Sequence, residues 1–256
     1  MKTKTIILKN ILKKIYKIFC WVYRNIVSIL QSFFLKDSKK NIKNIFFTLQ
    51  LKNNYYKNII KKSLKELNLE YQIIYLMDKN AIYKLLKNLF NKELRDKITK
   101  KTGYKYSIDY CIIYKNYPIP KSESNRSIYA NHFHVDKPYS RNMLKIILPI
   151  SVKDKDFGPI IVKRNKPLVK SLTENNTEDF SYFCSNENNT LIYGFYPSRC
   201  LHKALSPSED NQCHQIMVQL NPSRNWKINQ KIYRRQAHKE PKFTEFINLF
   251  DKFSKI

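Results

Sequence analysis

Glycine, acidic residues and paired cysteines are all scarce in this sequence. It has only three glycines in 256 residues, so each one is expected to mark a position where the backbone needs its freedom. The five cysteines include no Cys-x-x-Cys pair, which excludes the common zinc-binding and dithiol motifs and is typical of a reducing compartment. The basic, apolar N-terminus has no small-residue cleavage site, so the sequence does not predict a cleaved secretory signal.

The charge of the chain is strongly one-sided. Twenty Asp and Glu residues stand against 48 Lys and Arg residues, which gives a formal net charge of +28. Such a charge can indicate nucleic-acid binding. Here the lysines are spread along most of the chain, and no zinc-finger, helix-turn-helix or glycine-rich basic motif accompanies them. We therefore expect a solvated lysine surface and no specific nucleic-acid partner.

The length and the apolar content of 43% predict one domain with a sizeable core, preceded by a separate segment over residues 1–40. Between residues 5 and 35, apolar side chains recur at helical spacing, and four basic residues gather on another face: Lys9, Lys13, Lys17 and Arg24. This helix could lie on an anionic membrane surface or pack on the domain core, but its charges make it a poor spanning helix. The protein is expected in the cytoplasm, with peripheral membrane attachment under the first alternative.

Residues 41–256 are predicted to form the domain itself, an α+β fold with helices first and short strands after them. Two amphipathic helices are expected, over 55–69 and over 78–103, the second capped by Asp78 and stopped by Gly103. From Tyr104 the hydrophobic period changes to two, which predicts core strands up to about residue 222. The expected strands lie between Tyr104 and Pro118 and at 128–136, 143–152, 160–162, 190–195 and 214–220, with a loop over 171–189 and a helix over 244–253.

Residues Ile128–Asp136 are the main candidate for chemistry and read Ile-Tyr-Ala-Asn-His-Phe-His-Val-Asp. In an extended strand every second side chain points the same way, so His134 and Asp136 project together, one step from His132. An imidazole and a carboxylate side by side make two thirds of a facial triad for non-haem iron(II). The third ligand would be a distant histidine from the segment Leu191–His214. The alternative is a polar strand end that carries two histidines by chance.

The order of motifs after this strand makes the iron alternative more specific. His134-Val-Asp136 is followed by an apolar strand at 144–150, by Gly158-Pro159 and Ile160–Val162, by Leu191-Ile-Tyr-Gly194 and by Ser198-Arg-Cys-Leu-His202. In this order the sequence resembles the iron(II)- and 2-oxoglutarate-dependent oxygenases, in particular the phytanoyl-CoA dioxygenase-like branch, over about residues 104–222. The resemblance implies a double-stranded β-helix, or jelly roll, with the N-terminal helices packed on it.

The resemblance also implies a reaction. His134, Asp136 and His202 would hold Fe(II) on one face and leave the opposite positions to 2-oxoglutarate and dioxygen. The chain would then be a dioxygenase that hydroxylates a small-molecule, lipid- or sugar-linked substrate. Hydroxylation is favoured because halogenating relatives lack the carboxylate that Asp136 provides.

The sequence departs from this family at the cosubstrate. The family places an arginine roughly ten to twelve residues beyond the distal histidine, where it binds the far carboxylate of 2-oxoglutarate. Those positions here hold Gln212, Cys213 and His214. Candidates for the missing role are His214 if protonated, Lys145 on the strand after the His-x-Asp, and Arg224 on a following loop.

Two further residues and two further functions stay open at this point. Asn131 and Tyr129 precede the first ligand and are candidates for cosubstrate contact or pocket lining, with ordinary strand packing as the alternative. The missing arginine allows a catalytically inactive β-helix domain that binds a ligand or partner without turnover. A third possibility is a peripheral membrane protein whose N-terminal helix is the main functional element.

Overall fold

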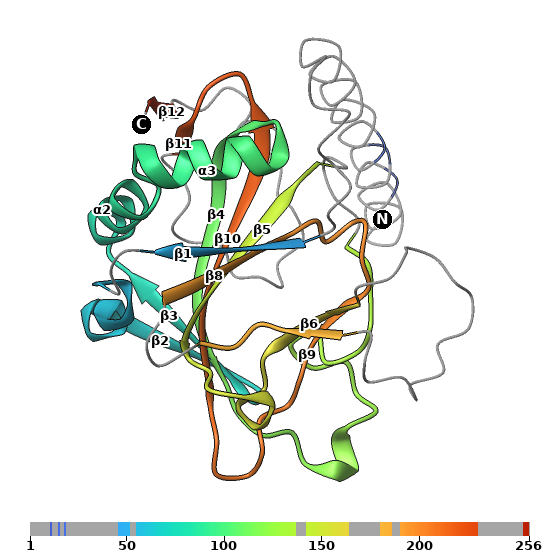
Figure 1. Cartoon of the computed structure of the whole chain (residues 1–256). Coiled ribbons are helices and arrows are strands. Elements are labelled where there is room, and N and C mark those ends of the chain that lie inside the picture. The colour runs from blue at the N-terminus through green and yellow to red at the C-terminus, as the bar shows by residue number, and fades with distance from the viewer. Residues whose placement is uncertain are drawn as a thin grey trace, which may run out of the picture.

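The computed structural model describes residues 46–51, 55–136, 142–163, 180–185, 190–229 and 253–255, together with Ile11, Ile15 and Ile18. These residues form a large and a small sheet (Figure 1). The large sheet contains β1 (Phe46–Leu51), β2 (Ser63–Leu69), β3 (Gln72–Met77), β4 (Lys105–Asn116), β5 (Leu144–Ser151), β8 (Thr190–Phe195), β10 (Cys213–Ser223), β11 (Lys227–Asn229) and β12 (Phe253–Lys255). The small sheet contains β6 (Ile160–Lys163), β7 (Phe180–Tyr182) and β9 (His202–Ala204).

The strand order shows that many neighbours in space are distant in the chain. The large sheet runs β1-β8-β5-β10-β4-β11-β12, with β3 beside β4 and β2 beside β3, and the small sheet runs β7-β6-β9. All strand pairs of the two sheets in the described residues are antiparallel except β11 with β4, which is parallel. The strands predicted around 104–117, 143–152, 160–162, 190–195 and 214–220 are confirmed as β4, β5, β6, β8 and β10.

Capping side chains set the ends of the helices. The single helix predicted before Tyr104 is in fact two, α2 (Lys79–Leu89) and α3 (Lys92–Thr102). Asp78 caps α2 as predicted, accepting hydrogen bonds from two backbone nitrogens at 2.8 and 3.3 Å. The break comes at Asn91, whose side chain accepts a hydrogen bond from a backbone nitrogen three residues on at 3.0 Å and so starts α3. Gly103 ends α3 with a φ of 77°, also as predicted.

The alternation of side chains on β5 divides the core in two. Leu144, Ile146 and Leu148 pack in one cluster with buried residues of α2 and α3. Ile147 points the opposite way, into the space between the sheets, where it meets buried residues of β6, β8 and β9. In Figure 1 the two helices lie together at the upper left and β6 and β9 at the lower right. Lys145 has the same parity as Ile147 and therefore lies on the inner face, between the sheets.

The helix predicted over 55–69 is wrong in its second half. Tyr55–Lys62 is a 3-10 helix, but Ser63–Leu69 is strand β2, antiparallel to β3. The chain reverses at Tyr71, which has a φ of 56°. The three-residue spacing of Leu64 and Leu67 fits a helix, but pairing with β3, which in turn pairs with β4, overrides that local preference.

Short strands were also missed. β7 lies inside the segment predicted as a loop over 171–189, and β1 had no prediction; both are strands because they pair with β6 and β8. Residues 5–35, 171–179 and 244–252 lie outside the described residues, except that Ile11, Ile15 and Ile18 are helical. The boundary between residues 1–40 and 41–256 stays a prediction. Among the described residues, no helix has the length and apolar composition needed to cross a bilayer.

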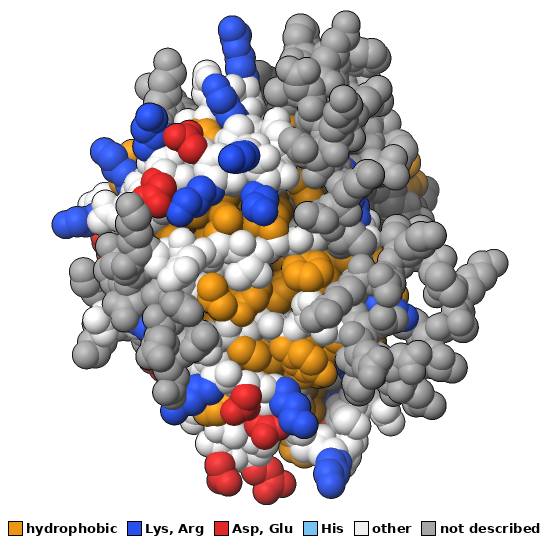
Figure 2. All heavy atoms as spheres, in the orientation of Figure 1, with side chains coloured by type: hydrophobic (Ala, Val, Ile, Leu, Met, Phe, Trp, Pro, Cys, Tyr) orange, Lys and Arg blue, Asp and Glu red, His pale blue; other side chains and the backbone are white. Residues whose placement is uncertain are grey.

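On the face shown in Figure 2, the charged side chains of the described residues gather at the upper and lower ends. Lys and Arg lie over the helices at the top of the view and, with acidic side chains, near its lower edge. Between them the described residues present hydrophobic and uncharged side chains. The described basic side chains of this face therefore lie mainly over the helices, and the expectation of a solvated lysine surface stays a prediction.

Candidate metal centre

The segment Ile128–Asp136 carries the two proximal candidate ligands, but it is not the extended strand that the sequence predicts. Tyr129 and Ala130 have φ values of 33° and 65° and form a turn. The Asn131 side chain holds this turn by accepting a hydrogen bond from the backbone at the start of the segment at 2.9 Å. Asparagine favours such turns, but the alternation of apolar and polar residues over this segment predicted a strand instead.

Backbone hydrogen bonds bring the distal histidine to this segment. His134 and His202 form an isolated antiparallel bridge, in which the nitrogen of each donates to the carbonyl oxygen of the other at 3.1 Å. Two residues on, the Asp136 nitrogen donates to the carbonyl oxygen of Pro197 at 2.9 Å. Residues opposite each other in an antiparallel pair project to the same side, so both imidazoles face one side of the bridge. Asp136 lies two residues beyond His134, so its side chain projects to the same side as the two imidazoles.

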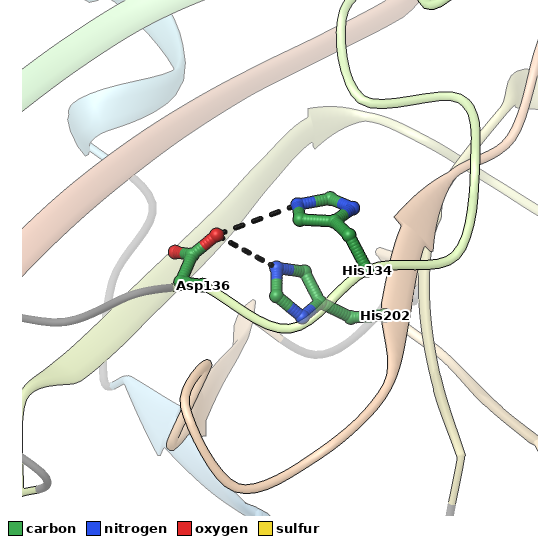
Figure 3. A group of neighbouring side chains, drawn as sticks. All are labelled: His134, Asp136 and His202. Carbon is green, nitrogen blue, oxygen red and sulfur yellow. Dashed lines mark ion pairs between the residues drawn. The ribbon is translucent and has the colours of Figure 1, made fainter. Parts of the chain in front are cut away.

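Figure 3 shows the three candidate ligands pointing toward one another. One ligand atom from each of His134, Asp136 and His202 can be chosen so that all lie within 4.8 Å of one another. Asp136 Oδ1 is 3.4 Å from His134 Nε2 and 3.7 Å from His202 Nε2. Two imidazoles and a carboxylate oxygen around one point are the donor set of a facial triad for non-haem iron.

The other nitrogen of each imidazole is hydrogen-bonded to the backbone. His134 Nδ1 lies 2.8 Å from the carbonyl oxygen of His132, and His202 Nδ1 lies 3.2 Å from that of Cys200. A carbonyl oxygen only accepts, so in each neutral ring Nδ1 carries the proton and Nε2 presents its lone pair. His202 is 4% exposed, and its Nε2 has no hydrogen-bond partner. A buried lone pair of this kind fits coordination to a divalent cation.

The charges around Asp136 keep it ionised. Burial alone would raise the pKa of this carboxyl, but the hydrogen bond from His134 and the positive charge of Lys145 lower the pKa well below its usual range. Lys145 Nζ lies 2.5 Å from Asp136 Oδ2. Burial, together with the Lys145 charge, lowers the pKa of His202 to about 3. The pKa of His134 is raised, chiefly by its hydrogen bond to Asp136.

As the pH is lowered, metal affinity is therefore expected to decrease because a single proton competes with the metal. Asp136 and His202, with lowered pKa values, are already free of the competing proton near neutral pH, whereas His134, with a raised pKa, must release one. Below the pKa of His134, the association constant for Ni(II) should drop about tenfold per pH unit. Calorimetric titration between about pH 5 and 8 measures this slope. A two-proton slope would contradict the neutral His202, and a flat profile would contradict the raised pKa of His134.

The remaining residues around the first ligands are engaged in local contacts. Tyr129 packs against the cluster between the sheets, and its hydroxyl donates to the carbonyl oxygen of Tyr117 at 2.9 Å. The Asn131 amide donates to the carbonyl oxygen of Arg126 at 2.9 Å. His132 is exposed, with Nε2 3.0 Å from that same carbonyl oxygen. The contacts of Asn131 and His132 stabilise the loop rather than the group of three candidate ligands.

Of the three residues predicted as a cationic anchor, Lys145 is the one with an ion pair to the triad. His214 lies edge-on to Tyr75 of β3, with 6.3 Å between the ring centroids, on the helix-covered side of the sheet. Burial lowers the pKa of His214 to about 4, so its ring is neutral and lacks the protonation on which its predicted role depended. Arg224 is exposed just after β10.

A buried polar group on β10 was not foreseen from the sequence. The Tyr114 hydroxyl donates to Gln215 Oε1 at 3.1 Å, and Gln215 Nε2 lies 2.8 Å from Cys213 Sγ. Gln215 and Cys213 are fully buried, and they alternate with Ile216, which faces the helices. Neutral hydrogen-bonding groups thus stand close to where the family arginine is expected. The available signal was Gln215 itself, a polar residue directly before the apolar run Ile216–Val218.

No family model matches the sequence, and a search of the curated proteins gives no match. Solved structures do resemble it. An oxidoreductase of the 2OG-Fe(II) oxygenase family from Burkholderia pseudomallei has a TM-score of 0.50 and 10% identity, over 79% of this chain and 94% of that chain. EctD from S. alaskensis, in a crystal structure with bound Fe, has a TM-score of 0.50 and 11% identity, over 73% of this chain and 76% of that chain. At these identities the likeness is one of fold, and it confirms the predicted double-stranded β-helix.

Proposed function

We propose that this protein, which has the fold of the iron(II)- and 2-oxoglutarate-dependent oxygenases, is itself such an enzyme and hydroxylates a small-molecule, lipid- or sugar-linked substrate. The observation that carries the proposal is the convergence of ligand atoms from His134, Asp136 and His202 within 4.8 Å. The buried Nε2 of His202, which has no hydrogen-bond partner, supports it further. So does the fold, which is shared with a protein described as a 2OG-Fe(II) oxygenase and with one that holds Fe.

In this proposal each residue of the triad has a defined task. His134 and His202 would hold Fe(II) through Nε2 while their Nδ1 protons stay on backbone carbonyl oxygens. Asp136 would hold it through Oδ1, with Oδ2 paired to Lys145. When bound, the ion supplies the redox chemistry by which dioxygen and a 2-oxo acid oxidise a substrate. The Asp136 carboxylate favours hydroxylation over halogenation, because a halide would have to occupy the coordination position that this carboxylate fills.

Anaerobic addition of Fe(II) and 2-oxoglutarate is expected to produce a visible metal-to-ligand charge-transfer band. The band requires both components in one complex, so neither should give it alone. His134→Ala should abolish it. The exposed His132, two residues away, provides the matched control, and His132→Ala should keep the band. Tight binding of Fe(II) with no band would rule out 2-oxoglutarate as the cosubstrate.

A catalytically inactive binding domain is the second candidate. It is favoured by the neutral Gln215 and Cys213 near the position of the family arginine and by the engagement of Lys145 with Asp136. Such a domain would fold and hold its ligand but would give neither the band nor substrate-independent consumption of 2-oxoglutarate.

Cytoplasmic location and attachment to a membrane surface through residues 5–35 stay proposals. They rest on the basic, amphipathic sequence of that segment. The exposure of the helical residues Ile11, Ile15 and Ile18, at 48, 57 and 63%, is compatible with such attachment. The oxygenase function and membrane attachment would both hold if the substrate is carried by a lipid.

A further inference from the structure

Lys145 reaches the three candidate ligands from the middle of the large sheet. It is the second residue of β5, and its backbone pairs with Gln219 of β10 on one side and with Phe195 of β8 on the other. Strands on both sides fix the backbone, and the side chain is only 14% exposed. The Phe195 ring in turn lies edge-on to His202, with 5.0 Å between the centroids. The ammonium group is therefore held beside Asp136 by a strand that is paired on both sides.

The carboxylate of Asp136 is divided between two kinds of partner. Oδ1 faces the Nε2 atoms of His134 and His202 at 3.4 and 3.7 Å, whereas Oδ2 is paired with Lys145 Nζ at 2.5 Å. Half-buried charges are screened less than exposed ones, so the ammonium acts strongly on anything that shares this carboxylate. A cation that approaches Oδ1 meets a carboxylate whose charge is already largely compensated.

The charges of this site can be added up directly. With both imidazoles deprotonated at Nε2, as metal ligands must be, the negative charge of Asp136 and the positive charge of Lys145 cancel. A divalent cation alone would bring two further positive charges next to the ammonium. A 2-oxo dicarboxylate brings two negative charges, so the cation and the dianion together leave the site neutral. A monoanionic 2-oxo acid would leave it positive.

We propose that Lys145 couples these two binding steps, weakening the binding of a divalent cation alone and favouring its binding together with a dianionic 2-oxo acid. The inference rests on the proposed function, because it takes His134, Asp136 and His202 as the metal ligands. Lys145 thereby supplies, from another strand, the positive charge that residues 212–214 do not. Coupling between two binding sites is reciprocal and typically of the order of 5–150-fold, and about tenfold is expected here.

The test uses the full chain and Ni(II), which does not change oxidation state in air. Calorimetric titration gives the Ni(II) affinity alone, with saturating 2-oxoglutarate, and with saturating pyruvate, which has the same 2-oxo carboxylate but no second carboxylate. In the wild-type protein, 2-oxoglutarate should strengthen Ni(II) binding about tenfold more than pyruvate does. Lys145→Met should bind Ni(II) alone several-fold more tightly than the wild type. The advantage of 2-oxoglutarate over pyruvate should disappear in this variant.

Three further variants make the result specific. Lys145→Gln is a second neutral variant that should repeat the effect, which guards against a folding defect of Lys145→Met. Lys145→Arg keeps the charge and should keep the coupling. Lys115→Met removes a half-buried lysine of β4 that lies over Tyr117, away from the candidate ligands, and should change nothing. Circular dichroism shows whether each variant is folded.

Two results would overturn the inference. Weaker binding of Ni(II) alone to the neutral variants would make Lys145 a residue that only positions Asp136. A 2-oxoglutarate advantage that persists without Lys145 would place the responsible charge elsewhere. If the wild-type protein bound no Ni(II) under any of these conditions, the proposed metal centre itself would be wrong, which differs from Ni(II) binding without coupling.

Discussion

His202→Ala is expected to lower the affinity for Fe(II) or Ni(II) at least about 100-fold, more than the roughly 10–100-fold that loss of a hydrogen-bond partner of a ligand usually costs. The variant removes one of the two imidazoles and leaves two of the three candidate ligands. The Fe(II)–2-oxoglutarate absorption band and any turnover should be lost with it. Competition with a chromogenic chelator measures the affinity directly.

The stability of His202→Ala should change much less than its metal affinity. The substitution removes a buried nitrogen that has no hydrogen-bond partner, which is favourable, and leaves a cavity beside Phe195, which is not. The two effects oppose each other, so the free energy of unfolding without metal should change by no more than about 2 kcal/mol. The exposed His132 again gives the control, because His132→Ala should preserve metal affinity. Full affinity in His202→Ala would mean that metal binds at another place.

Gly158→Ala is expected to lower the free energy of unfolding by about 3–4 kcal/mol. Gly158 has a φ of +70°, and a Cβ built there would lie 2.6 Å from the Pro207 nitrogen and 2.7 Å from the Leu205 carbonyl oxygen. Both are backbone atoms, so relief requires the segment after β9 to move. That segment is held by a hydrogen bond from the Leu205 nitrogen to the Pro159 carbonyl oxygen at 3.0 Å. Urea unfolding followed by circular dichroism measures the loss.

The control for Gly158→Ala is Gly103→Ala. Gly103 also has a positive φ, of 77°, but it ends α3 far along the chain from β9. Its replacement should cost about 1–2 kcal/mol from backbone strain and leave metal affinity unchanged. Gly158→Ala should also weaken metal binding, because β9 begins at His202. Equal losses of stability in the two variants would show that the segment after β9 moves aside easily.

The sequence predicts well those features that depend on near neighbours in the chain. The two-residue period of β4 and the caps at Asp78 and Gly103 express the local preferences of strand and helix. The order of motifs from the His-x-Asp to His202 led to the correct fold, although the structures compared with this chain share only 10 and 11% of its residues. The order of the motifs along the chain thus indicated the fold, which the low sequence identity alone would not.

The features that were missed depend on strand pairing with distant segments or on backbone angles that the residue types do not indicate. Ser63–Leu69 is a strand because β3 is beside it, and a three-residue apolar spacing cannot report that. Tyr129 and Ala130 adopt positive φ values in their turn. Tyrosine and alanine rarely do so, and the residue types therefore did not predict this turn. Lys145 was one of three candidates for binding the cosubstrate, and that role stays a prediction. Its contact with Asp136 could not be foreseen, because it depends on how the fold brings β5 to the segment that ends at Asp136.

The backbone bridge between His134 and His202 has a consequence for how the proposed metal centre would be loaded. Because the main chains of the two residues are hydrogen-bonded at 3.1 Å in both directions, the proximity of their imidazoles comes from backbone pairing and needs no ion to create it. Small zinc domains are the opposite case, since their chains collapse to an ordered state only around the metal. If the proposed function holds, loading and unloading of the ion would be exchange reactions of an already folded protein, and starvation for iron would leave an inactive but intact molecule.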